Sequence, residues 1–232
     1  MPKVPSARRG ADDEEVVELE NAGYSGEFYA RLASRARDAG EYLLVGDIDV
    51  DSAEMCGLFL LDALASGRPM ATIRLCSGGG DEDAALFLVS IVEHCKASGM
   101  TVRVVGAGCV GSAALDVFSA CSRGYRLAFE TTSFMTHSSS GYIKDDEDYK
   151  LRRRFDKWVL KTYTNVSPAV MKRFLKTGNW WFDAEKAVGY GIVDGIVKVG
   201  ERLPEGPVEG RRKTRDEQKA DLVADGDERE DD

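Results

Sequence analysis

The segment 105–115, VGAGCVGSAAL, constrains this chain more than any other, because a short apolar strand passes there through small residues into a predicted helix. Gly106, Gly108 and Gly111 allow backbone conformations that a side chain would forbid, and they leave room for another group to lie against the turn. Ser112 therefore stands at a helix N-terminus with little bulk around it. Two interpretations fit: Ser112 is the N-cap of the helix, since serine is a preferred cap, or it is a nucleophile.

Short apolar strands alternate with helices through most of the chain, which predicts an α/β domain with parallel strands. The strands are expected at residues 42–45, 71–76, 101–105, 125–129, 134–136 and 192–199. The helices are expected at residues 26–38, 52–64, 81–97, 112–120, 147–164, 168–176 and 184–190. This alternation predicts one domain over residues 26–199.

The two ends of the chain have a different composition. Residues 1–25 are polar, mixed in charge and without the apolar centre of a signal peptide, so a mobile N-terminal segment is expected. Residues 201–232 include 12 acidic and 7 basic residues and therefore carry five of the nine net negative charges. With almost nothing apolar to bury, residues 200–232 are expected to form an acidic disordered tail.

Composition excludes several classes of partner and site. The net charge of −9 argues against binding to nucleic acid, and no apolar run is long enough to cross a membrane. The five cysteines show no CxxC spacing and lie mostly in apolar segments, so we expect reduced thiols and a cytoplasmic protein rather than disulfides or a zinc site. No metal ion and no cofactor are predicted.

A second glycine-rich turn, Ser77-Gly78-Gly79-Gly80, follows the second predicted strand. If that strand neighbours the third, both turns lie at the sheet edge where α/β proteins bind ligands. The backbone N–H groups of Gly79 or Gly80 and of Ala113 would then converge, as an oxyanion hole requires. A plain tight turn and a phosphate loop are the alternatives, but a phosphate loop needs a lysine where this chain has Asp81-Glu82, which repels anions.

The chain has two histidines, and a serine nucleophile needs a base. His94 lies near the end of the predicted helix at 81–97, where a cap or dipole role is expected. His137 follows the predicted strand at 134–136 and precedes a segment of serine and glycine. This position suits a general base, although a structural histidine fits it as well.

Five features together resemble the proteolytic subunit of the ATP-dependent Clp protease, the ClpP family, over about residues 28–199. The 25-residue step from Ser112 to His137 is the spacing of that family, and SGGG at 77–80 is similar to its SPGG turn, with glycine in place of proline. The remaining features are FYARL at 28–32, GCVGS at 108–112, and AEKAVGYGIVD at 184–194, which resembles the closing AxEAxxxGxxD signature.

The resemblance implies a crotonase-like fold, a repeated ββα superhelix in a single domain with a protruding helical handle. It implies self-association into a ring, with a paralogous subunit as a further option, and an AAA+ unfoldase as a candidate partner. It also implies serine-type hydrolysis of a polypeptide, with Ser112 as the nucleophile and His137 as the general base. Gly80 and Ala113 fall on the amides of the oxyanion hole.

Asn179 occupies the position where the family has the aspartate of its catalytic triad. An aspartate fixes the tautomer of the histidine and stabilises the imidazolium, whereas asparagine brings no charge. We therefore expect a slow enzyme, or one that uses assembly or a nearby acid such as Asp183 to align its histidine. The step from His137 to Asn179 is 42 residues, which is short for the family's handle and leaves the stacking of two rings open.

Three functional hypotheses follow. The favoured one is a ClpP-like serine endopeptidase, and the short handle suggests a bacteriophage-type capsid-maturation protease as a variant of it. The second is a catalytically impaired ring subunit with a structural or regulatory role, for which Asn179 is the main support. The third is a crotonase-type acyl-CoA enzyme, which is disfavoured because the sequence offers no basic cluster for the CoA phosphates.

Overall fold

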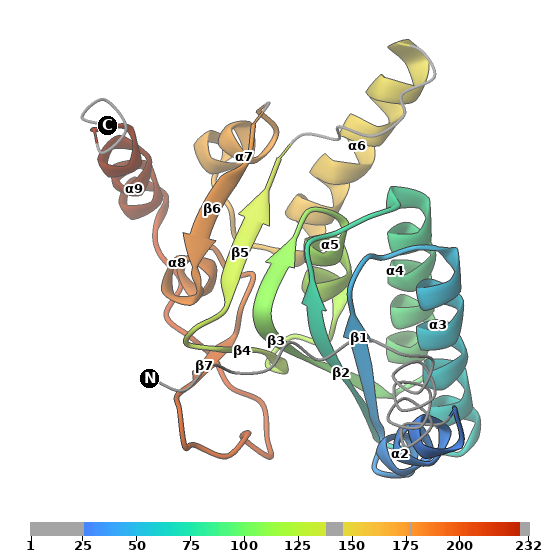
Figure 1. Cartoon of the computed structure of the whole chain (residues 1–232). Helices are drawn as coiled ribbons and strands as arrows, with labels where there is room; N and C mark the ends of the chain where they lie inside the picture. The colour runs from blue at the N-terminus through green and yellow to red at the C-terminus, as the bar shows by residue number, and fades with distance from the viewer. Residues whose placement is uncertain (1–25, 138–145, 177, 228–232) are drawn as a thin grey trace, which may run out of the picture. The chain divides into compact units, whose positions relative to one another are not determined.

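The computed structural model describes residues 26–137, 146–176 and 178–227 (Figure 1). The N-terminal segment predicted to be mobile, residues 1–25, lies outside this part of the chain. The chain divides into two compact units, Met1–Ala39 and Gly40–Asp232. The first contains helix α2 (Gly26–Asp38), as the sequence predicts, and all elements named below belong to the second.

The second unit alternates strands and helices, as expected for an α/β domain. Its strands are β1 (Glu41–Val45), β2 (Met70–Ser77), β3 (Thr101–Gly111), β4 (Arg126–Phe129), β5 (Ser133–Thr136), β6 (Trp180–Asp183) and β7 (Gly195–Val197). Its helices are α3 (Val50–Ala65), α4 (Glu82–Ala97), α5 (Ala113–Ala120), α6 (Asp146–Tyr163), α7 (Pro168–Phe174), α8 (Ala184–Gly189) and α9 (Arg215–Asp227). Most predicted elements are confirmed to within a few residues, but the sequence pattern does not predict β6 or α9.

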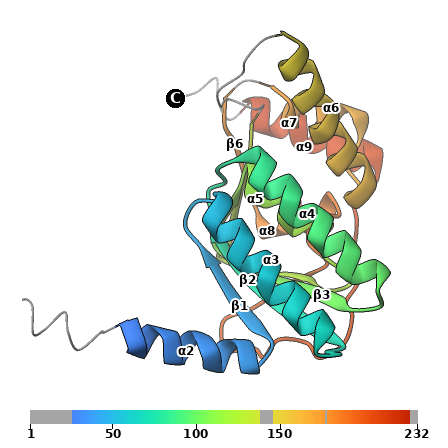
Figure 2. The ribbon, with the colours of Figure 1, turned by 90° about the vertical axis from the view of Figure 1, so that its right-hand side faces the viewer.

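The main sheet has the order β1-β2-β3-β4-β7, and each neighbouring pair is parallel, which confirms the predicted strand arrangement. One face of this sheet packs on the main hydrophobic core, and Figure 2 shows α3 and α4 side by side over it. Side chains alternate between the two faces of a strand. A smaller apolar cluster accordingly lies on the opposite face, formed by Val105, Leu127 and Val197 with Leu203 and Val208.

Strand β3 changes partner along its length. Its residues Val104–Gly106 pair with β4, whereas Cys109–Gly111 pair with β5. Between these two stretches Gly108 has a φ of +70°, and the register with β2 shifts at the same level. The strand therefore bends, and its last residues run beside β5 and β6 (Figure 1).

Strand β6 departs from the parallel pattern, because it pairs antiparallel with β5. Its four residues are too few to give a periodic signal in the sequence. Trp180 and Phe182 of β6 instead pack with Phe174 of α7 and with Tyr190, at ring-centroid separations of 5.1–6.0 Å. Aromatic packing between segments distant in sequence thus holds this strand in place.

Helix α6 occupies the part of the chain where the family resemblance predicts a helical handle. Arg152 in this helix ties it to α4, since its Nη1 lies 3.1 Å from Oε2 of Glu82. The same guanidinium donates through Nε to Asp148, one turn earlier, at 3.2 Å.

No helix in the described ranges is long and apolar enough to cross a membrane.

Residues 200–227 differ from the disordered tail expected for residues 200–232. Leu203 and Val208 pack on the smaller apolar cluster, and α9 follows with the Gln218 side chain fully buried. The expectation is wrong for these residues because a few well-placed apolar side chains, rather than average composition, decide the outcome. Residues 201–227 are called the C-terminal strap below.

A buried ion pair joins β4 to the residues that precede β7. Arg126 of β4 is 0% exposed and donates to both carboxylate oxygens of Asp194, at 2.8 and 2.5 Å. Arg126 also donates to the Tyr163 carbonyl oxygen at the end of α6, at 2.8 Å. Asp194 accepts a further bond from the Gly124 N–H at 2.7 Å. The pair therefore satisfies polar groups of β4, α6 and the approach to β7 together.

We expect Asp194→Asn to lower the free energy of unfolding by about 3–5 kcal/mol, because it leaves a buried guanidinium without a counter-charge. Denaturant unfolding monitored by circular dichroism measures this loss. The matched control is Glu41→Gln, which breaks the pair of Glu41 with Arg74 (2.7 Å), where both side chains are about 30% exposed. That change should cost about 1 kcal/mol or less. Equal losses in the two variants would contradict the importance of the buried pair.

Candidate active site

Ser112 is the junction between β3 and α5. Its φ of 50° and ψ of −128° make it the one residue other than glycine with a positive φ in the described part of the chain. Such a conformation costs about 1–3 kcal/mol, so the surroundings must hold it. The Ser112 N–H donates to the Met135 carbonyl oxygen of β5 at 2.9 Å. The Ser112 hydroxyl makes no capping bond to α5, so the N-cap interpretation of this side chain is wrong.

His137 follows β5 directly, and its Nε2 lies 2.8 Å from Oγ of Ser112. The parallel pairing of Gly111 with Met135 brings the two side chains together across 25 residues of sequence. A hydroxyl at this distance from an imidazole nitrogen can pass its proton to that nitrogen when it attacks a carbonyl carbon. His94, by contrast, is exposed in the last turn of α4.

The glycine-rich turn after β2 lies directly against this serine. A Cβ atom on Gly79 would stand 2.6 Å from Cβ of Ser112 and 3.1 Å from the Ala113 nitrogen, and Gly79 has a φ of +115°. Ile48, just after β1, fixes the turn: its N–H donates to the Gly79 carbonyl at 2.8 Å, and its carbonyl accepts from Asp81 N–H at 2.7 Å. The two glycine-rich turns predicted to meet at one sheet edge therefore do so.

Two backbone N–H groups beside Ser112 are available to a ligand. The bridge to Ile48 uses the Gly79 carbonyl and the Asp81 N–H, one on each side of Gly80. The Gly80 N–H is trans to the Gly79 carbonyl in the same peptide group, so it points away from that bridge. The Ala113 N–H belongs to the first residue of α5, which has no acceptor within the helix. Fixed donors of this kind stabilise an oxyanion because they need no reorganisation as charge develops.

The strand pair β5 and β6 brings Asn179 toward His137. The pairing ends with Thr136 opposite Trp180, so His137 directly follows the last paired residue of β5 and Asn179 directly precedes the first paired residue of β6. The Asn179 side chain is nevertheless exposed, and it forms no hydrogen bond with the described residues. The structure thus supplies proximity without a bond to the imidazole.

Asp183 does not serve as the nearby acid considered from the sequence. It lies opposite Ser133, at the far end of β6 from His137. Its side chain accepts from the Lys186 N–H at 2.8 Å and so caps α8. Four residues of strand separate it from Asn179, which amounts to about 13 Å.

The carboxyl group of Asp116 lies one turn after Ser112, in the first turn of α5. Burial raises the pKa of the Asp116 carboxyl group well above its usual range, and the carboxylates of Asp156 and Glu82 raise this pKa further. A raised pKa favours the neutral form of this carboxyl group, which reduces the negative charge beside the N-terminus of α5, where the helix dipole favours an anion. The electrostatics of this helix are therefore compatible with stabilising an oxyanion near Ser112.

Sequence reasoning missed two residues of this site. Ile48 anchors the glycine-rich turn at Gly79 and Gly80, and Met135 both accepts from the Ser112 N–H and covers Gly111 with its side chain. Neither has a signal in the sequence, because each acts through its backbone or as an ordinary apolar residue. The described residues contain no group of three or more histidine, cysteine, aspartate or glutamate side chains that could hold a metal ion.

Comparison with known proteins decides the family. The profile of the family described as Clp protease matches residues 25–200. The chain belongs to the Clp protease family. The match includes both glycine-rich turns, Ser112, His137 and Asn179, and it ends where the C-terminal strap of this Clp family member begins.

Individual relatives agree with this assignment. The ATP-dependent Clp protease proteolytic subunit 2 of Treponema denticola is 26% identical over 185 residues, covering 75% of this chain and 90% of the relative. The subunit of the same name from Treponema pallidum is 26% identical over 177 residues, covering 71% and 85% of the two chains. An asparagine-to-aspartate mutant of ClpP1 from Listeria monocytogenes superposes with a TM-score of 0.65 at 26% identity, covering 73% of this chain and 97% of that one. The predicted resemblance and fold class are confirmed.

The close approach of the two turns is testable with Gly79→Ala. The new methyl group would collide with Ser112 at a φ that disfavours side chains, so we expect labelling of Ser112 by a fluorophosphonate to fall about tenfold or more. Gly78→Ala is the matched control, because Gly78 has no atom within 4 Å of the added Cβ. Mass spectrometry of the labelled protein measures both effects. Normal labelling of Gly79→Ala would show that the turn is not held against the serine.

Proposed function

We propose that this member of the Clp protease family is a serine-type endopeptidase that uses Ser112 as nucleophile and His137 as general base. The observation that carries the proposal is the 2.8 Å contact between Nε2 of His137 and Oγ of Ser112, made from a strained backbone at the head of α5. A serine that serves only as a helix cap needs neither this strain nor an imidazole partner.

The reaction follows from the positions of these groups. Oγ of Ser112 attacks the scissile carbonyl carbon while its proton passes to Nε2 of His137, and the carbonyl π electrons move onto oxygen. The N–H groups of Gly80 and Ala113 donate to this oxyanion. The intermediate collapses, the C–N bond breaks, and the leaving amine takes the proton from His137. A water molecule then attacks the acyl carbon while its proton passes to the same imidazole; the C–Oγ bond breaks, Oγ of Ser112 takes the proton back from His137, and the carboxylic acid product leaves.

Asn179 sets the expected rate. As the third residue of the triad it orients His137 but adds no charge to stabilise the imidazolium. An asparagine that offers its N–H₂ group to the imidazole also selects the wrong tautomer for the reaction. We therefore infer a slow endopeptidase, in which assembly or substrate binding draws Asn179 into contact with the ring.

The partners in this proposal come from the family. Relatives named as proteolytic subunits of an ATP-dependent protease support a polypeptide substrate. Membership of the Clp protease family supports a ring of self-associated subunits and an AAA+ unfoldase. A ring shared with a paralogous subunit, a cytoplasmic location and a capsid-maturation role remain predictions from the sequence. The acyl-CoA alternative is less well supported, because it gives no role to the contact between Ser112 and His137.

A catalytically impaired ring subunit is the second candidate function. The observation that favours it is the exposed Asn179 side chain, which makes no hydrogen bond in the described part of the chain. A subunit of this kind would keep the fold and the ring contacts of the family and depend on an active paralogue for hydrolysis.

Labelling with a fluorophosphonate distinguishes the two candidates. The endopeptidase should be labelled at Ser112, and the label should disappear in Ser112→Ala and in His137→Ala because each removes part of the proton path. Ser98→Ala, which changes an exposed serine after α4, should label normally. An assembled wild-type protein that never takes the label would support the impaired subunit.

The triad assignment makes a separate prediction. Asn179→Asp should raise peptide turnover about tenfold or more, since the reverse change in a complete triad costs about ten-thousandfold. A fluorogenic peptide assay on the assembled protein measures this gain. Ser98→Asp adds the same charge at an exposed position after α4 and should leave turnover unchanged. Equal or lower turnover of a folded Asn179→Asp protein would mean that another group orients His137.

A further inference from the structure

The C-terminal strap lies beyond the part of the chain that matches the family, yet the domain is shaped to receive it. Three glycines of the domain lie under the strap, and a Cβ atom on any of them would collide with it. The distances from such a Cβ are 2.7 Å for Gly124 to Pro207, 2.6 Å for Gly195 to Val208, and 2.9 Å for Gly189 to Lys213. The strap is therefore a fitted part of the structure.

Backbone and buried polar contacts fasten the strap near α7 and α8. Lys213 N–H donates to the Gly189 carbonyl at 2.9 Å. Gln218, which is 0% exposed, accepts from the Ser167 N–H at 2.7 Å and donates to the Asn165 carbonyl at 2.9 Å. Each polar atom of this buried amide thus has a partner, as a stable buried group requires.

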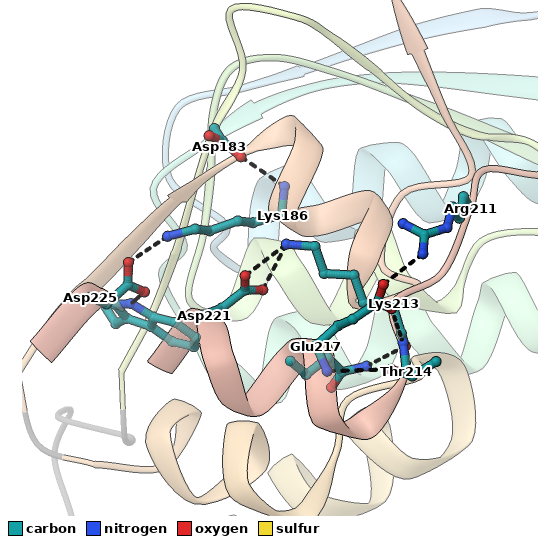
Figure 3. Close-up of polar contacts among 10 residues, drawn as sticks. Asp183, Lys186, Arg211, Lys213, Thr214, Glu217, Asp221 and Asp225 are labelled. Atoms are coloured by element: carbon teal, nitrogen blue, oxygen red, sulfur yellow. Dashed lines mark hydrogen bonds and ion pairs between the residues drawn. The ribbon is translucent and has the colours of Figure 1, made fainter. Parts of the chain in front are cut away.

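The last turns of α9 reach the strand next to the active site. Asp225 is 14% exposed, and its carboxylate accepts from Nζ of Lys186 at 2.5 Å and from Nε1 of Trp180 at 3.3 Å. Figure 3 shows this carboxylate between the end of β6 and the lysine of α8. Trp180 is 2% exposed and directly follows Asn179. A carboxylate on the strap therefore holds the residue next to the third triad position.

Strand β6 needs such support. In the described part of the chain it pairs with β5 alone, over four residues that end at Trp180. Asn179 lies one residue outside this pairing, so the strand ladder does not fix its backbone. The indole of Trp180, packed among aromatic rings and bonded to Asp225, is the nearest fixed point to it.

We propose that Asp225 is a positioning residue for the active site, acting through Trp180 to hold Asn179 near His137. This inference rests on the proposed function, because it gives Asn179 a role in orienting the imidazole. A displacement of about 1 Å at a catalytic group costs about 100-fold in rate, so a single buried hydrogen bond at this place has a measurable effect.

Asp225→Ala, compared with Asp221→Ala, tests the proposal. Asp221 is the matched control because it lies one turn earlier on the same face of α9, is 16% exposed, and is paired with Lys213 at 2.8 Å rather than with Trp180 (Figure 3). We expect Asp225→Ala to lower kcat for a fluorogenic peptide about tenfold with KM changed less than about twofold, and Asp221→Ala to leave both near wild type. Both variants should lose similar stability in thermal melts.

A second readout does not depend on hydrolysis. Diethyl pyrocarbonate acylates histidine, and the chain has two, so His94 serves as an internal reference for His137 in mass spectrometry. We expect the acylation rate of His137 relative to His94 to change about threefold or more in Asp225→Ala, because the bond at one ring nitrogen sets the orientation of the other. If wild-type protein fails to hydrolyse peptides, the proposed function fails, and this readout alone decides the positioning role.

The outcomes separate a positioning role from a structural one. Effects confined to Asp225→Ala in both readouts support the proposal. A double-mutant comparison also supports the proposal if Trp180→Phe lowers kcat and the double variant with Asp225→Ala loses no more than the single variants. The two residues then act through the same contact. Equal effects of the two aspartate variants, or no effect of either, would overturn it. If Asp225→Ala does not fold, Asp225→Asn is judged by the same comparison.

Discussion

The structure of the site depends on the unusual backbone of Ser112, which turns from strand to helix at a positive φ. Three neighbours make this conformation tolerable: the Met135 carbonyl accepts the serine N–H, Gly79 approaches without a side chain, and Ile48 holds that glycine in place. The strain is then offset by the fold rather than by local bonds. The Ser112 hydroxyl makes no capping bond to α5 and lies instead 2.8 Å from Nε2 of His137.

The bend in β3 links this site to the rest of the domain. Before Gly108 the strand belongs to the parallel sheet and packs on the core, and after it the strand runs beside β5. The same bend therefore separates the stabilising part of the sheet from the part that carries Ser112 and His137. The buried pair of Arg126 and Asp194 joins β4 to the residues before β7, so the other end of the sheet is fixed as well.

The C-terminal strap bears on Asn179, which occupies the position where the family has the aspartate of its catalytic triad. In a chain with aspartate at that position, the negative charge helps to hold the imidazole. Here Asn179 has no charge, and the nearest fixed contact is made by its neighbour Trp180 with Asp225 of the strap. The substitution and the strap occur in one chain, and both concern the same short strand. This pairing suggests that order imposed by the strap replaces part of the order that charge would supply.

The sequence by itself determined the alternation of strands and helices and the two glycine-rich turns, and it predicted Ser112 and His137 as the candidate pair of the site. Each of these features has a local signature or a characteristic spacing. The sequence also contains a signal for the start of α9, a capping box formed by Thr214 and Glu217. The Thr214 N–H donates to the Glu217 carboxylate at 2.8 Å, and the Glu217 N–H donates to the Thr214 hydroxyl at 3.3 Å. Average composition does not reveal this signal. Only the tertiary structure decided the rest. The partner switch of β3, the antiparallel β6, the anchoring by Ile48 and the docking of the strap all arise from contacts between segments far apart in the chain. Such contacts leave no periodic trace in either segment alone, and the free energy of each depends on a surface that exists only after folding.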